Sequence, residues 1–501
     1  MTKTVQLITY VDRLGKNFSG LGSILNEELS GLFGGVHILP FFDPIDGADA
    51  GFDPANHTAV DSRLGDWNDV RNLSKQTDLM ADLIINHISS DSEQFQDVLK
   101  NDEHSKYWDL FLKKEDVFQN NGTQEELGKI LRLHPNAPFL PITLDNGKTY
   151  NFWSTFSDKQ LDINVETEIG QKYLTGILDS FADAGIKYVR LDAVGFAIKR
   201  RSTSCFMLPE TFEFIESFNK LAAARGMQVL VEVHSYYKTQ IEIAKKVSWV
   251  YDFALPGLVL HTLFSGNAAA LKKWLEISPR NCITVLDTHD GIGVIDAGPE
   301  EDKPGLLSED DIQSLIEQVH SNTKGQSKAA SGEAAENLDV SQLNTTYFDA
   351  LGRSDRQYLL ARCIQLFCPG IPQIYYVGLL AGHNDMQLLE KTGNGRDINR
   401  QYFSRADIQQ SLDKPVVESL FGLIRLRNSA SGFNGEFELL DCSDQSLQIK
   451  WTHQQSTIEL KLDLVNMSAA IVQNENGIVT EYSINDQLER DHEQRADAKQ
   501  S

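Results

Sequence analysis

Cysteine is scarce in this chain, and its five copies are scattered along 501 residues. They form no Cys-x-x-Cys motif, and none stands near a histidine at the spacing of a zinc site. An odd number of dispersed cysteines in apolar surroundings favours reduced core thiols over a disulfide framework. The set comprises Cys205, Cys282, Cys363, Cys368 and Cys442.

Long hydrophobic runs and basic charge are also in short supply. No apolar stretch is long enough to span a bilayer, and residues 1–4 enter a predicted strand without the pattern of a signal peptide. Lys and Arg number 46 against 71 Asp and Glu, for a formal net charge of -25. An acidic surface repels nucleic acid and anionic lipid, so we expect neither as a partner, and solubility explains most of the acidity. These features predict a cytoplasmic protein.

Apolar, β-branched segments alternate with helix-compatible segments along most of the chain. This alternation produces βαβ units and a count of eight parallel strands, which predicts a (β/α)8 TIM barrel. The predicted helices include 168–184, 208–225, 258–276 and 355–368. The predicted strands are 5–10, 35–42, 80–86, 186–191, 227–232, 249–252, the apolar part of 282–290, and 371–377.

Two polar, turn-rich stretches interrupt the alternation and predict inserted, loop-rich subdomains at 88–165 and 291–350. The barrel then comprises residues 1–87, 166–290 and 351–432. From 433 to 485 short alternating runs predict a small C-terminal antiparallel β domain. Residues 486–501 are almost all charged or amide-bearing, and we expect this tail to be disordered.

Titratable side chains stand at the carboxyl ends of several predicted strands, where a parallel barrel places its active site. Any one of them has roughly even odds of being only a cap or turn former. Five together are hard to explain in this way, and Arg190 shares a strand face with the first of them. The five are Asp192, Glu232, Asp290, His87 and His289.

Paired carboxyl groups at a barrel mouth suit the chemistry of glycosidic bonds. One attacks or stabilises the oxocarbenium-like centre, and the other transfers a proton. We expect Arg190 to keep Asp192 ionised, whereas Glu232 needs a raised pKa to arrive protonated. The sequence therefore predicts a double displacement on the fourth and fifth strands.

Seven motifs carry a resemblance to a known family. Nearly the whole chain, from Val5 to Leu464, resembles the α-amylase-type retaining glycosidases, and most closely the sucrose phosphorylases. The motifs are the loop 46–54, Asn86-His87, and residues 190–195, 203–207, 231–237, 286–291 and 395–400.

The resemblance implies that Asp192 is the nucleophile, Glu232 the general acid/base, and Asp290 the acid that binds sugar hydroxyls and stabilises the transition state. Phe196 stands where the family has a tyrosine, which removes one hydroxyl but leaves a ring for stacking. The residues implied to bind the glucosyl group are Asp49, His87, Arg190, His289 and Arg396, with Phe52 and Phe156 as an aromatic wall.

The acceptor side departs further from the family. A Tyr-x-x-Arg motif is expected in the first insertion, but this chain has Leu131-Arg132-Leu133-His134; the expected Leu-Tyr-Gln reads Val340-Ser341-Gln342. Phosphate needs a cation beside the carboxylates, and Arg132 and His134 are the candidates. The alternative is that both are solvated loop residues. Gln342 matches the family's acceptor-side glutamine.

The leading prediction is phosphorolysis of sucrose to α-D-glucose 1-phosphate and D-fructose through a covalent glucosyl-aspartate. The altered loops leave open a sucrose 6-phosphate or glucosylglycerol phosphorylase, and a hydrolase or transglucosidase is a further alternative. A non-catalytic scaffold is disfavoured because all three acids are present. We expect no metal and no cofactor, since the Asp-rich loop 46–53 lacks EF-hand spacing. A homodimer is implied by the resemblance alone.

Overall fold

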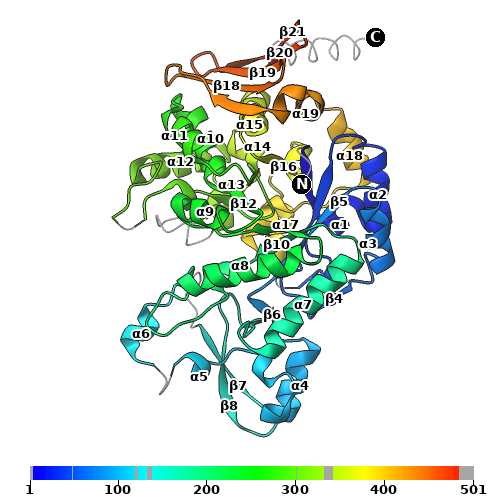
Figure 1. Ribbon diagram of the computed structural model, residues 1–501, viewed down its shortest axis with the longest axis vertical. Helices are drawn as coiled ribbons and strands as arrows, with labels where there is room; N and C mark the ends of the chain where they lie inside the picture. The colour runs from blue at the N-terminus through cyan, green and yellow to red at the C-terminus, as the bar shows by residue number, and fades with distance from the viewer. Residues whose placement is uncertain are drawn as a thin grey trace.

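A computed structural model describes residues 4–47, 49–118, 122–132, 138–300, 302–331 and 342–484. At its centre eight strands close into a barrel in the order β1-β16-β13-β12-β11-β10-β5-β2, and every neighbouring pair is parallel (Figure 1). The predicted (β/α)8 fold is therefore confirmed. The strands are β1 (Gln6–Thr9), β2 (Gly35–Ile38), β5 (Asp78–Ile84), β10 (Tyr188–Asp192), β11 (Gln228–Val231), β12 (Trp249–Asp252), β13 (Cys282–Thr284) and β16 (Ile371–Tyr375).

The barrel strands are buried almost throughout, because helices cover their outer face and side chains fill the interior. One helix prediction is wrong: the segment 258–276 forms two helices, because Gly266 adopts a left-handed conformation, φ 67°, that ends the first. The helices around the barrel are α1 (Val11–Gly15), α2 (Phe18–Asn26), α3 (Trp67–Ser74), α7 (Glu168–Asp183), α8 (Pro209–Ala223), α9 (Tyr237–Ala244), α10 (Ala254–Ser265), α11 (Ala269–Ile277), α15 (Asp355–Phe367), α16 (Tyr376–Leu379), α17 (Met386–Thr392), α18 (Arg405–Leu412) and α19 (Pro415–Ser429).

The chain between β5 and β10 forms a lobe of short elements. It contains the antiparallel pair β6 (His87–Ser89) and β9 (Gln160–Asp162), and the hairpin β7 (Phe139–Thr143) and β8 (Thr149–Trp153). The Asp-Asn-Gly turn signal at 145–147 lies at the tip of that hairpin. In Figure 1 this lobe lies at the opposite end of the molecule from the C-terminal sheet. Its helices are α4 (Glu93–Asn101), α5 (Lys114–Val117) and α6 (Gln124–Gly128).

The second interruption follows β13. It begins with the two-residue strand β14 (Ile292–Gly293), which pairs antiparallel with β15 (Gln342–Leu343). Residues 332–341 lie outside the described residues, and Val340 and Ser341 with them. The helices of this segment are α12 (Glu309–Asn322), α13 (Gln326–Ser331) and α14 (Tyr347–Ala350).

A five-stranded antiparallel sheet ends the described chain, as the predicted C-terminal β domain requires. It packs on α15 through β19 and β20, and the Trp451 indole donates a hydrogen bond to the Phe367 carbonyl, at the end of α15, at 2.8 Å. The predicted tail 486–501 lies outside the described residues. The strands are β17 (Glu436–Leu439), β18 (Ser446–His453), β19 (Ser456–Asp463), β20 (Ser468–Glu475) and β21 (Ile478–Ser483).

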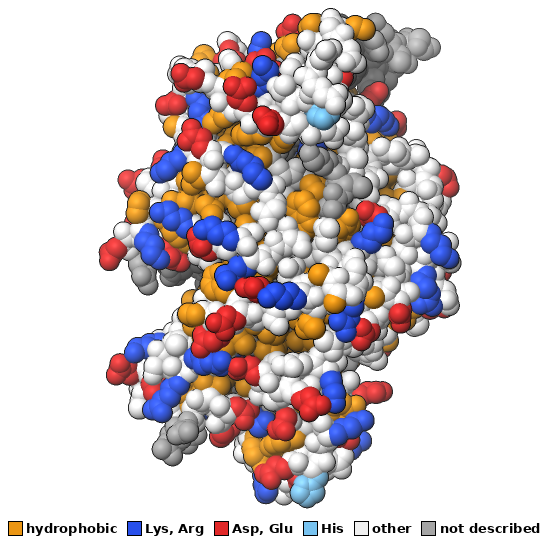
Figure 2. Space-filling model, viewed as in Figure 1, with side chains coloured by type: hydrophobic (Ala, Val, Ile, Leu, Met, Phe, Trp, Pro, Cys, Tyr) orange, Lys and Arg blue, Asp and Glu red, His pale blue; other side chains and the backbone are white. Residues whose placement is uncertain are grey.

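The five cysteines are free thiols, as predicted. Acidic and basic side chains are interspersed on the face that Figure 2 shows. Across the described ranges, no helix has both the length and the apolar character that crossing a membrane requires.

Candidate active site

The two carboxyl groups predicted to react lie on neighbouring strands of the barrel. Asp192 is the last residue of β10, and Glu232 follows the last residue of β11. Arg190 lies within 2.9 Å of an Asp192 oxygen through Nη1 and 3.5 Å of Glu232 Oε1 through Nη2. Nη1 also contacts Asp82 of β5. One buried guanidinium thus contacts three carboxyl groups, and it holds the two that are predicted to react in fixed positions.

Burial dominates the ionisation of Asp192. It raises the pKa of this carboxyl well above the ordinary value, and nearby Glu232 raises it further, whereas Arg190 lowers it. The sequence predicts that Arg190 keeps Asp192 ionised; the guanidinium has the expected position and effect, but burial outweighs it.

For Asp290, the effect of cationic neighbours on the pKa outweighs the effect of burial. Burial again disfavours its charge, but the guanidinium of Arg396 at 3.1 Å, with help from His289, Arg190 and Arg400, lowers its pKa well below the ordinary range. Arg396 and Arg400 also lie 3.4 and 3.3 Å from Asp49, and they lower the pKa of that carboxyl despite its burial. Asp49 and Asp290 are therefore acceptors with fixed negative charge.

Aromatic rings and neutral imidazoles lie beside these carboxyl groups. Phe52 stacks on His289 with 4.6 Å between ring centroids. The guanidinium carbon of Arg190 lies over the Phe52 ring, 5.6 Å from its centroid. His87 lies 3.0 Å from the Phe52 carbonyl through Nε2, and its ring is 5.1 Å from that of Phe156. Burial lowers the pKa of His289 to about 3 and also lowers that of His87, so both present uncharged imidazole nitrogens.

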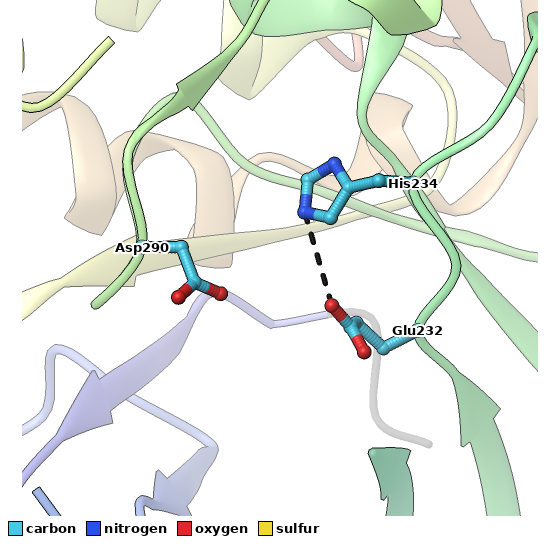
Figure 3. A group of neighbouring side chains, drawn as sticks. All are labelled: Glu232, His234 and Asp290. Carbon is cyan, nitrogen blue, oxygen red and sulfur yellow. Dashed lines mark ion pairs between the residues drawn. The ribbon is translucent and has the colours of Figure 1, made fainter. Parts of the chain in front are cut away.

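Two functional residues are missed by the sequence reasoning. Arg400 is fully buried against Asp49, and its Nε donates a hydrogen bond to the His289 carbonyl at 2.9 Å. The sequence indicates it only as a second arginine in the motif 395–400. His234 lies in the motif 231–237, but nothing in the sequence around it predicts a role for its side chain. Its Nε2 is 3.8 Å from Glu232 Oε1, and Figure 3 shows the side chains of His234, Glu232 and Asp290 turned toward one another.

These three residues also form a group that could hold a metal ion, since one candidate ligand atom from each lies within 4.8 Å of the other two. Imidazole and carboxylate donors suit a transition-metal ion. However, Arg396 contacts Asp290 and Arg190 contacts Glu232, so guanidinium groups already compensate part of the negative charge. The absence of a metal and of a cofactor stays a prediction.

The structure describes two of the three residues predicted to bind the acceptor. Gln342 of β15 reaches the site, with its Nε2 at 3.2 Å from His234 Nε2. Arg132 is exposed and lines a small surface pocket with Leu131 and Phe196, whose ring packs edge-on against Phe156 of the glucosyl wall at 5.4 Å. His134 lies outside the described residues.

Comparison with known proteins gives this geometry a family. Residues 31–253 match the family model described as the alpha amylase catalytic domain. A sucrose phosphorylase from Agrobacterium vitis is 53% identical over 90% of this chain and 93% of that protein. This chain belongs to the sucrose phosphorylase family. A sucrose phosphorylase from Bifidobacterium adolescentis is 48% identical over 92% of this chain and 92% of that protein.

A solved structure extends the likeness to the whole fold. The crystal structure of sucrose 6F-phosphate phosphorylase from Thermoanaerobacter thermosaccharolyticum matches 97% of this chain and 99% of its own, with a TM-score of 0.89 and 36% identity. The chain is therefore an enzyme of the α-amylase type, as the motifs predict. Relatives within this family are named for different substrates, so membership of the family does not by itself identify the acceptor that this chain uses.

Proposed function

We propose that the protein is a sucrose phosphorylase that transfers the glucosyl group of sucrose to inorganic phosphate with retention of configuration, giving α-D-glucose 1-phosphate and D-fructose. The observation that carries this proposal is the contact of one guanidinium, that of Arg190, with both Asp192 and Glu232 in a chain 53% identical to a sucrose phosphorylase. Two carboxyl groups held side by side on adjacent strands suit a double displacement.

In the first half-reaction the carboxylate form of Asp192, which Arg190 stabilises against the effect of burial, attacks C1 of the glucosyl group. The glycosidic bond to fructose breaks, and Glu232 gives its proton to the departing oxygen. Asp290, kept ionised by Arg396, accepts hydrogen bonds from sugar hydroxyls and stabilises the positive charge that develops on the ring. His87 and His289 are neutral and offer further hydrogen bonds to hydroxyls, and Phe52 and Phe156 pack against the apolar face of the sugar.

In the second half-reaction a phosphate oxygen attacks C1, and the bond to Asp192 breaks. Glu232, now a carboxylate, receives the proton of the incoming oxygen. Because two inversions restore the α configuration, the product is α-D-glucose 1-phosphate. Arg132 is exposed next to Phe196 and is our candidate for a phosphate ligand, together with His134.

The reactive pair is tested with Asp192→Ala and Glu232→Gln. We expect Asp192→Ala to lower sucrose phosphorolysis by at least about 10⁴-fold, because no covalent glucosyl-enzyme forms. Glu232→Gln should slow sucrose strongly but α-glucosyl fluoride much less, because fluoride departs without a proton. The anomer of the product is read by NMR. Turnover of Asp192→Ala at the wild-type rate, or a β-phosphate product, would overturn the mechanism.

The acceptor is tested separately in the reverse direction, by phosphate release from α-glucose 1-phosphate. We expect fructose to be the best acceptor, ahead of fructose 6-phosphate and glycerol. A preference for fructose 6-phosphate or glycerol would assign the enzyme to one of the alternative phosphorylases. Glucose release that does not depend on phosphate would instead indicate a hydrolase or a transglucosidase.

Location and assembly belong to the same proposal. Five free cysteines, four of them buried, support a reducing compartment such as the cytoplasm. The homodimer rests on family resemblance, and sedimentation of the purified chain tests it.

A further inference from the structure

His234 is held from three sides. Its ring stacks on Phe253, which follows β12, with 3.9 Å between centroids and 16° between planes. Its Nδ1 lies 3.1 Å from Oδ2 of Asp296, and its Nε2 lies 3.2 Å from the amide nitrogen of Gln342. A side chain with both ring nitrogens contacted and one face covered has little freedom to rotate. Its remaining polar neighbours are Glu232, at 3.8 Å, and Asp290.

Asp296 is anchored by more than this one contact. It lies in a short 3-10 helix, Ile295–Ala297, and its side chain is fully buried. Its Oδ1 accepts hydrogen bonds from the Ser235 backbone N–H at 3.0 Å and from the Gln240 amide at 3.1 Å. Ser235 follows His234 in sequence and Gln240 lies in α9, so Asp296 ties the insertion after β13 to the segment that carries the histidine.

The same insertion supplies the contact at the other ring nitrogen. Gly293 of β14 pairs with Gln342 of β15, so the strand pair that brings Gln342 to Nε2 leads directly into the turn that brings Asp296 to Nδ1. A Cβ at position 293 would lie 2.6 Å from Asp296 Oδ2, closer than such atoms approach. The chain therefore makes room for the carboxylate at this point.

We propose that Asp296 is a positioning residue for the acceptor side of the site: it holds His234 with a proton on Nδ1 and with Nε2 directed at the place where the acceptor meets Glu232. The proposal rests on the proposed function. A carboxylate only accepts hydrogen bonds, so the nitrogen that faces Asp296 must carry the proton. In the neutral ring, Nε2 accepts a hydrogen bond from the Gln342 amide. A second proton on Nε2 replaces that contact, and the imidazolium offers a charged N–H to a phosphate oxygen.

The charges around His234 favour that second proton. Burial opposes it, but Asp296, Glu232 and Asp290 outweigh burial and raise the pKa of His234 above the ordinary value. The uncharged groups that face the ring are Phe253 and Gln342. Phosphate that approaches Asp296, Glu232 and Asp290 needs such a donor.

Asp296→Asn is the informative substitution, because the amide keeps the shape and one acceptor oxygen but removes the charge. In a two-step mechanism, kcat/KM for phosphate reports the second half-reaction, and kcat/KM for α-glucosyl fluoride reports the first without a sugar leaving group. We expect the former to fall about 10- to 100-fold and the latter to stay within about 3-fold. Asp252→Asn is the matched control, since Asp252 is also a buried acid, but its carboxylate accepts hydrogen bonds from Trp274 and Leu255 rather than from the His234 ring.

Two further measurements separate positioning from general damage. In a His234→Ala background, Asp296→Asn should lower kcat/KM for phosphate by less than about 2-fold, because it acts through the imidazole. The ratio of wild-type to Asp296→Asn activity should also rise and then fall with pH, since the variant loses its imidazolium at lower pH than the wild type.

Equal losses with phosphate and with glucosyl fluoride, or full additivity with His234→Ala, would overturn the proposal. Unchanged kinetics in Asp296→Asn would also overturn it. A wild-type enzyme that uses no phosphate at all would instead refute the proposed function, and this baseline is measured first.

Discussion

Asp252 ends β12 as a buried carboxyl group that the proposed reaction does not use. Burial raises its pKa to about 7, although hydrogen bonds from the Trp274 indole at 3.0 Å and the Leu255 backbone N–H at 3.1 Å oppose the shift. In the unfolded chain the same group ionises near its ordinary value of 3.8. The folded protein therefore binds this proton more tightly than the unfolded chain does.

The sign of the stability effect follows from that difference. The stabilising contribution is complete below pH 3.8 and is lost as the pH rises toward 7, because only the unfolded chain ionises freely in that interval. Asp252→Asn does not ionise. We expect the wild type to lose about 3 kcal/mol relative to the variant between pH 4.5 and pH 7.5. Parallel pH profiles of unfolding free energy for the two proteins would contradict this.

Among individual residues, the sequence predicts candidate site residues best where a strand positions the side chain. Asp192 and Glu232 could be found because a buried apolar run ends at each of them. Asp296 could not, because it meets His234 only through a loop 62 residues further along the chain. Arg400 was hidden for a related reason: its partner Asp49 lies 351 residues away, in a loop after β2.

At the element scale, the short helix α16 packs against a buried ion pair. Arg362 of α15 donates to both oxygens of Asp287 at 2.9 Å, and both side chains are almost completely buried. A Cβ at Gly378 in α16 would lie 1.9 Å from Asp287 Oδ2 and 2.3 Å from Arg362 Nη2. The helix can approach this pair only because position 378 carries no side chain.

Gly378→Ala is therefore expected to destabilise the protein by roughly 3 kcal/mol or more, since an added methyl group must displace one member of a buried pair. The matched control is Gly422→Ala in α19, where no atom lies within 4 Å of the added Cβ. That change should be neutral or stabilise by up to about 1 kcal/mol, because alanine favours the helix. Denaturant unfolding of both variants makes the comparison, and similar losses in the two would refute the steric account.

The sequence predicts elements well where hydrophobic periodicity is strong. All eight barrel strands lie within or close to their predicted ranges, because both faces of each strand are buried and the apolar run is continuous. The strands β20 and β21 were not singled out, since Ser468–Glu475 and Ile478–Ser483 mix polar with apolar residues and β21 exposes most of its side chains. β21 lies at the edge of the sheet, and β20, although paired on both sides, buries only two of its eight side chains, so both carry little of the burial signal on which such predictions depend.

In the molecule as a whole, the C-terminal sheet packs on α15, the helix that precedes the last barrel strand, β16. Leu447, Ile449, Ile458 and Leu460 of the sheet are fully buried, and β19 and β20 contact α15. Phe433 packs against Trp451 of β18, and Arg427 of α19 lies over the Phe433 ring. Asn428 of α19 in turn accepts a hydrogen bond from the Val5 backbone N–H at 2.8 Å and donates to the Leu32 carbonyl at 2.8 Å. The sheet, α19 and the first barrel strand therefore form one continuous structure.

A chain that ends at residue 434 should consequently fail to fold. Each of those side chains contributes about 1.5–3 kcal/mol when buried, and together they rival the 5–15 kcal/mol by which proteins are stable. We expect the shortened chain in the insoluble fraction, whereas a control chain that ends at residue 484 keeps all five strands and stays soluble. Soluble, active protein from the chain ending at residue 434 would contradict this prediction.

The position of β1 in the barrel also bears on how the protein is made. This strand pairs with β2 on one side and with β16 on the other, where Gln6 is opposite Gln373. A ribosome that adds roughly 5–20 residues per second needs roughly 20–70 s between synthesis of the two strands. During that interval both edges of the growing sheet present unpaired backbone groups, which other chains can bind. Barrel closure, and with it the joining of the Asp49 loop to Arg396 and Arg400, is therefore among the last events in the biosynthesis of this enzyme.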